Sequence, residues 1–75
     1  MKKIWITKDK EGITIFDNEP YFDHKERIWV CKENVNFTFV DGLWVVKKFD
    51  LIPDPKYSYE FEITNEEYES FDWFS

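Results

Sequence analysis

The dominant period of the sequence is two, the spacing at which side chains alternate between the faces of a β-strand. Residues 57–64 (YSYEFEIT) alternate aromatic or aliphatic side chains with polar ones, and the polar face carries Glu60 and Glu62. Residues 3–7 (KIWIT) and 13–16 (ITIF) repeat the pattern on either side of the loop DKEG at 9–12, whose glycine can take a positive φ. These stretches predict a mainly β chain that starts with a hairpin.

A second hairpin is predicted around Asp41-Gly42, which stands between two β-rich runs in residues 36–48. The pair Asp-Gly in this setting is typical of a two-residue type I′ turn. Such a turn would place Phe39 opposite Trp44 and would give the hairpin an aromatic face.

The remaining segments are shorter and more polar. Residues 17–27 contain Pro20, which lacks an amide hydrogen, and they predict the longest loop. Residues 28–31 (IWVC) predict a strand, residues 32–34 a short turn, and residues 50–56, with two prolines, a bend or a short 3₁₀ segment. We therefore expect about six short antiparallel strands in a meander that closes toward a small barrel or a curled sheet.

The whole chain, residues 1–75, is predicted to form one small domain. A chain of 75 residues is marginally stable unless its core is dense, and 21% of the residues here are aromatic. Each buried ring removes roughly 150–250 Å² of surface from water, so a core built of rings can stabilise a chain of this length.

Residues 65–75 end the chain as NEEYESFDWFS and are predicted to form a docked or a flexible tail. Thr64 and Glu67 have the spacing of a capping box, which predicts the start of a short helix. Tyr68 and Phe71 are expected to dock on the sheet, and the final DWFS is expected to be loose.

The formal net charge is −6, and it is unevenly distributed. Residues 1–49 contain eight acids and nine bases, whereas residues 50–75 contain eight acids and a single base, Lys56. Such an asymmetry attracts basic partners and repels nucleic acid. Direct nucleic-acid binding is therefore not expected.

Cys31 is the only cysteine, so no intramolecular disulfide can form. The N-terminus MKKIWITKDK has too short an apolar run for a signal peptide or a membrane span. We expect a protein of the cytoplasm that does not insert into a membrane.

No pattern in the sequence predicts catalysis, a metal or a cofactor. His24 and Cys31 stand seven residues apart and are interpreted as a loop histidine and a small buried thiol. Both glycines belong to predicted turns, so no phosphate-cradling loop is available. Glu60 and Glu62 share a strand face, but a chain of this length can hardly build the groove of a glycosidase.

Protein recognition is the function that the composition favours. Acidic side chains accelerate the encounter with a basic partner protein, and aromatic rings among them can form the strong contacts at the centre of an interface. The expected contact set for a basic surface on a partner protein is Glu60, Glu62, Glu66, Glu67, Glu69, Asp72, Trp73 and Phe74.

Three parts of the sequence, KIWITKDKEGITIFDNEP, the isolated Trp29 and FDLIPD before an acidic aromatic strand, resemble small proteins encoded by bacteriophages and prophages. That class has no agreed activity. The resemblance implies a host cytoplasm as the setting and an inhibitor that blocks a host protein, such as a nucleic-acid-handling or antiviral defence factor.

Two other function classes fit the same residues. One is a module that sequesters a small ligand or a nucleotide, with Trp5, Trp29 and Trp44 lining its pocket. The other is a structural or assembly protein that self-associates through exposed strand edges as a homo-oligomer.

Overall fold

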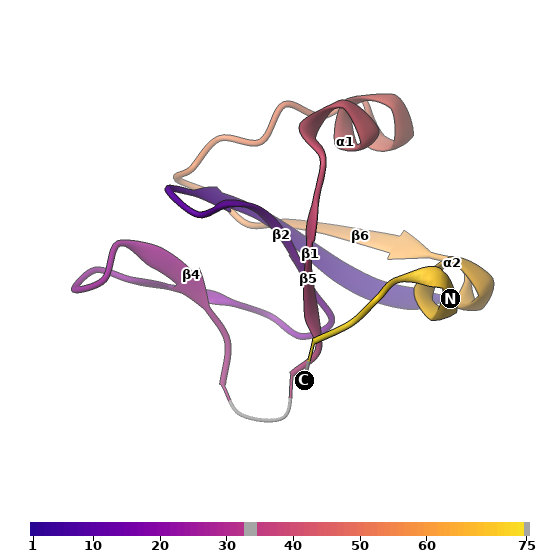
Figure 1. Ribbon diagram of the computed structural model, residues 1–75, viewed down its shortest axis with the longest axis horizontal. Helices are drawn as coiled ribbons and strands as arrows, with labels where there is room; N and C mark the ends of the chain where they lie inside the picture. Colours follow the sequence, from indigo (N-terminus) through magenta and orange to yellow (C-terminus); the bar gives the residue numbers. More distant parts are fainter. Residues whose placement is uncertain (33–34, 75) are drawn as a thin grey trace.

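The computed structural model describes residues 1–32 and 35–74, and these residues form six strands and two helices (Figure 1). The mainly β prediction is confirmed. The elements in chain order are β1 (Lys2–Asp9), β2 (Gly12–Phe16), β3 (Tyr21–Asp23), β4 (Ile28–Val30), β5 (Phe37–Val40), α1 (Gly42–Phe49), β6 (Tyr59–Ile63) and α2 (Asn65–Ser70).

Four strands form an antiparallel sheet in the order β5-β2-β1-β6, and β3 and β4 form a separate two-stranded hairpin. The predicted first hairpin is present as β1 and β2, with Asp9 opposite Gly12. The predicted meander closing toward a barrel is wrong for the described part of the chain. Strands β5 and β6 pair with β2 and β1, so they lie at opposite edges of an open sheet.

The core lies between one face of this sheet and α1, which crosses above the strands in Figure 1. Ile6 pairs with Ile15 on one side and with Tyr59 on the other, and this register brings the aliphatic side chains of three strands onto one face. Ile4, Ile6 and Ile15 are fully buried there beneath Val45 of α1. Each such side chain contributes roughly 1.5–3 kcal/mol when removed from water.

The predicted hairpin turn at Asp41-Gly42 is wrong, because Asp41 caps a helix. Its backbone is extended (φ −78°, ψ 138°), and its carboxylate accepts a hydrogen bond from the Leu43 amide. Val45 and Phe49 stand four residues apart, so a helix brings both onto the side that packs against the sheet. Lys47 and Lys48 lie favourably in the last turn.

The other segments differ from the predictions in smaller ways. The predicted loop at 17–27 contains β3, which pairs with β4. The predicted strand at 57–64 begins only at Tyr59. The predicted turn at 32–34 lies mostly outside the described residues. Neither described helix is long and apolar enough to cross a membrane.

Candidate partner-binding surface

Helix α2 is fastened to the sheet by a half-buried polar cluster. The carboxylate of Asp17 accepts hydrogen bonds from the Asn36 backbone amide (2.9 Å), the Asn36 side-chain amide (2.9 Å) and the Tyr68 hydroxyl (2.8 Å). The hydrogen bond to Asp17 raises the pKa of Tyr68, and burial adds to this effect. The acidic residues of α2 are therefore held in a defined place relative to the sheet.

Glu67 is used inside the molecule. It completes the predicted capping box with Thr64, whose hydroxyl accepts a hydrogen bond from the Glu67 amide at 3.1 Å. Its carboxylate also accepts a hydrogen bond from Lys48 of α1. This bond lowers the pKa of Glu67, and the Thr64 backbone amide lowers it further. Glu67 therefore joins α2 to α1 and is less free for a partner than the prediction assumed.

Glu60 and Glu62 point from one face of β6, the strand at the edge of the sheet. Glu60 lies 3.5 Å from the Lys3 ammonium group, and both side chains are more than half exposed. An exposed pair of this kind contributes little to stability. Glu62 makes no ion pair or hydrogen bond with any residue that the structure describes.

Three more carboxylates continue from β6 into α2 and the residues after it. Glu66, Glu69 and Asp72 are exposed, and within the described residues their side chains have no ion pair or hydrogen bond. Glu66 and Glu69 stand three residues apart and so lie on the same side of the helix. We call these four free carboxylates, Glu62, Glu66, Glu69 and Asp72, the acidic edge.

The two terminal rings have separate places. Trp73 packs against Tyr68 and Phe71, with ring centres 5.0 and 5.3 Å apart, and its indole N–H donates to the Tyr68 carbonyl. Phe74 forms a backbone bridge with Phe37 of β5 and leaves 54% of its surface exposed. The expectation of a loose end is wrong for residues 72–74, and Phe74 lies at the sheet edge opposite β6.

Two of the three tryptophans expected to line one pocket lie on opposite sides of the sheet. Trp44 of α1 packs near Phe49 and Phe71 on the core side. The Trp29 backbone amide donates to Asp9, so β4 lies on the opposite side of the sheet (Figure 1). A common pocket for these indoles is therefore not formed.

His24 and Cys31, the one histidine and the one cysteine of the sequence, lie in separate segments. The Cys31 thiol donates to the carbonyls of Asn18 (3.4 Å) and Glu19 (3.2 Å), and burial raises its pKa. His24 lies in the exposed turn between β3 and β4. In residues 1–32 and 35–74, no three His, Cys, Asp or Glu side chains gather as metal ligands.

Comparisons with protein-family models, with curated proteins and with solved structures found no match for this chain. Its function is therefore inferred from the geometry of its own residues.

Proposed function

We propose that the chain is a non-enzymatic binding protein whose acidic edge docks on a basic surface of a partner protein. The observation that carries the proposal is the set of free carboxylates on β6 and α2, Glu62, Glu66, Glu69 and Asp72. Unpaired surface carboxylates accelerate encounter with a basic surface and oppose docking on an acidic one. The polar cluster of Asp17, Asn36 and Tyr68 supports the proposal because it holds α2 in place before binding. The entropy lost when α2 docks on a partner is therefore smaller.

The backbone of β6 supports a specific docking mode. Within the described residues β6 pairs with β1 alone, so the N–H and C=O groups of its other side are available to an added strand. Glu60 and Glu62 alternate along one face, which favours a partner strand with Lys or Arg at alternate positions.

The resemblance to small phage-encoded proteins supports a bacterial host protein as the partner. Carboxylates in a row can occupy a groove that otherwise accepts phosphates. A host protein that handles nucleic acid, including an antiviral defence factor, is therefore the partner class that we infer, and inhibition is the expected result of its occupancy.

The proposal is tested with two variants of equal net charge. One variant, E62K/E66K/E69K, reverses the acidic edge. The control, E11K/E19K/E26K, reverses three exposed glutamates elsewhere on the molecule. Affinity capture from bacterial lysate at low and high salt is followed by measurement of Kd with each purified captured protein.

The partner is expected to bind the wild type and the control, and to bind E62K/E66K/E69K at least tenfold more weakly. High salt should weaken the binding of the wild type, because exposed charges are screened. A partner that binds all three proteins equally, without dependence on salt, would contradict the proposal.

Pairing of β6 with β6 of a second copy is the competing use of the same edge. Antiparallel pairing would bring two acidic strand faces together, and like charges across a pair of strands are destabilising. We expect the protein to remain monomeric at neutral pH, which light scattering over a range of concentrations will show.

A further inference from the structure

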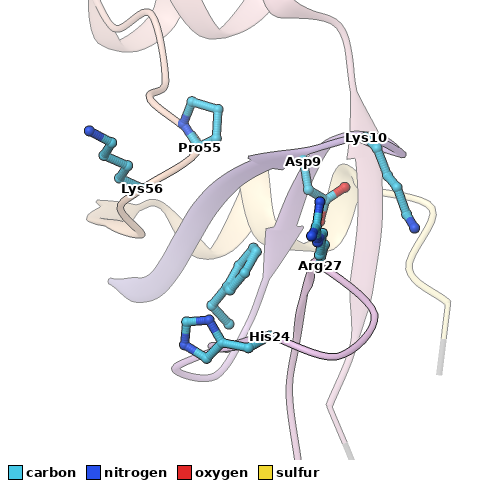
Figure 2. A pocket seen from close by; sticks show the side chains of 7 residues that line it. Asp9, Lys10, His24, Arg27, Pro55 and Lys56 are labelled. Carbon is cyan, nitrogen blue, oxygen red and sulfur yellow. The ribbon is translucent and has the colours of Figure 1, made fainter.

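A pocket of about 600 Å³ lies beside the β1–β2 turn and the β3–β4 hairpin (Figure 2). None of the described residues that line it belongs to the acidic edge. This volume is in the usual range for sites that hold a small ligand. Three segments bound the pocket: the end of β1 with the following turn, the β3–β4 hairpin, and the chain between α1 and β6. The side chains labelled in Figure 2 are Asp9, Lys10, His24, Arg27, Pro55 and Lys56.

The apolar walls of the pocket are held in place by contacts outside it. Phe22 contributes one wall and packs edge-on against Trp29, with ring centres 5.5 Å apart. Pro55 contributes another wall, and its carbonyl accepts a hydrogen bond from the Trp29 indole N–H at 3.1 Å. Trp29 thus joins the two walls, so the pocket is formed before a ligand arrives.

The charge of the pocket is opposite to that of the protein. It is lined by four basic side chains, those of Lys10, His24, Arg27 and Lys56, against the single carboxylate of Asp9. In the part of the chain that the structure describes, none of the four basic side chains makes an ion pair or a hydrogen bond.

The Asp9 carboxylate is already occupied by backbone amides. One oxygen accepts from Glu11 and the other from Trp29, both at 2.9 Å. The negative charge of Asp9 therefore helps to hold the β1–β2 turn and to attach the β3–β4 hairpin to it. The amino ends of Lys10 and Lys56 extend outward on opposite sides in Figure 2, which places them at the rim of the pocket.

Arg27 stands at a backbone position that suits glycine. Its φ is 59°, in the left-handed region, at the end of the four-residue turn between β3 and β4. An arginine there carries a conformational cost that a glycine avoids. Arg27 lines the pocket, and a role for its guanidinium group there would explain why an arginine stands at this position despite the cost.

We propose that this pocket binds a free mononucleotide, a planar ring that carries a phosphate. The ring lies between Phe22 and Pro55, and the phosphate meets Arg27 and His24, with the two lysines at the rim. The planar fork of an arginine suits two oxygens of one phosphate, and the apolar walls suit a base. The pocket and the acidic edge are separate sites, so an experiment can refute one proposal and leave the other standing.

The first test titrates ¹⁵N-labelled protein with AMP, adenosine and inorganic phosphate, and follows amide chemical shifts. AMP is expected to shift the amides of Phe22, Trp29 and Lys56 and to bind at least tenfold more tightly than adenosine or phosphate. Absence of these shifts at millimolar AMP would overturn the proposal. Equal affinity for phosphate and AMP would overturn the role of the ring.

The second test compares Arg27→Gly with Lys25→Gln, which removes a charge from the same turn without touching the pocket lining. R27G is expected to raise the Tm, because it relieves the positive φ, and to weaken AMP binding at least tenfold. K25Q is expected to bind AMP like the wild type. A folded R27G that binds AMP like the wild type would overturn the proposal.

A short single-stranded oligonucleotide tests whether the pocket prefers a free nucleotide or a nucleotide within a nucleic-acid strand. It is expected to bind more weakly than AMP, because the net charge of −6 repels a string of phosphates. Tighter binding of the oligonucleotide than of AMP would overturn the assignment to a free nucleotide.

Discussion

Tyr68 is the residue through which α2 is attached to the sheet. Its hydroxyl donates to Asp17, and Asn36 donates to both Asp17 and the Tyr68 oxygen. Asp17 and Tyr68 lie 51 positions apart in the chain, so no local pattern could have predicted this bond. The capping box of Thr64 and Glu67 was predictable because its two partners are three residues apart.

Tyr68→Phe is expected to lower the free energy of unfolding by about 1.5 kcal/mol at neutral pH, the low end for a hydrogen bond to a charged group, because the site is half-buried. The pKa of Tyr68 is raised in the folded state, so its stabilisation is complete below the unfolded value of about 10 and is lost as pH rises through the folded value. The difference between wild type and Y68F should therefore shrink as the pH rises above about 10, the unfolded value.

Urea denaturation of both proteins at neutral pH and at about pH 11, above the reference tyrosine value, checks the expectation. Tyr57→Phe is the control, because Tyr57 is exposed and makes no side-chain hydrogen bond within the described residues. A loss in Y57F equal to that in Y68F would show that the bond to Asp17 does not stabilise the fold.

At the scale of elements, α1 is where the sequence pattern was misleading. Asp-Gly is a signal for a type I′ turn, but aspartate is also a favoured helix N-cap. Residues 43–49 have a composition that fits a strand or a helix. Burial decides between them, since Trp44, Val45 and Phe49 all pack against the core, whereas neighbouring residues of a strand point to opposite faces. That contact depends on strands far away in the sequence.

Substitutions at Asp41 and Gly42 distinguish the cap from the turn. Asp41→Ala is expected to lower the free energy of unfolding by about 1 kcal/mol through loss of the N-cap, and Asp41→Ser should retain most of it. Gly42→Ala should change stability by only about 0.5 kcal/mol, since alanine suits a helix and its methyl would meet the movable end of Ile13 at 3.3 Å.

Urea denaturation and circular dichroism of the three variants measure these effects. In a type I′ turn, Gly42 would need a positive φ, and alanine there would be strongly unfavourable. Global unfolding of G42A would therefore contradict the helical assignment.

At the scale of the molecule, the chain is built in three layers, with α1 on one side of the sheet and the β3–β4 hairpin on the other (Figure 1). The charge count indicated that acidic side chains gather on β6 and α2, because these two elements follow each other in the sequence. It did not predict the basic pocket, whose lining comes from three distant segments and whose charges are diluted among acids along the chain.

The hairpin layer is expected to open independently of the sheet. Its side-chain attachments include the Trp29 amide to Asp9 and the Trp29 indole to Pro55, whereas β1 is paired on both sides and buries Ile4 and Ile6. Native-state hydrogen exchange should therefore give the amides of β3 and β4 a lower opening free energy than those of β1.

Asp9→Ala removes the acceptor for the Trp29 amide and should accelerate exchange in β3 and β4 roughly tenfold, equivalent to about 1.4 kcal/mol, while β1 changes less. Asp54→Ala is the matched control, because Asp54 caps the amide of Lys56 in an exposed turn and makes no hydrogen bond to the hairpin. If wild-type β3 and β1 exchange with the same free energy, the hairpin and the sheet unfold as one unit. The pocket would then share the full stability of the core, because the β3–β4 hairpin that forms one of its walls could not open alone.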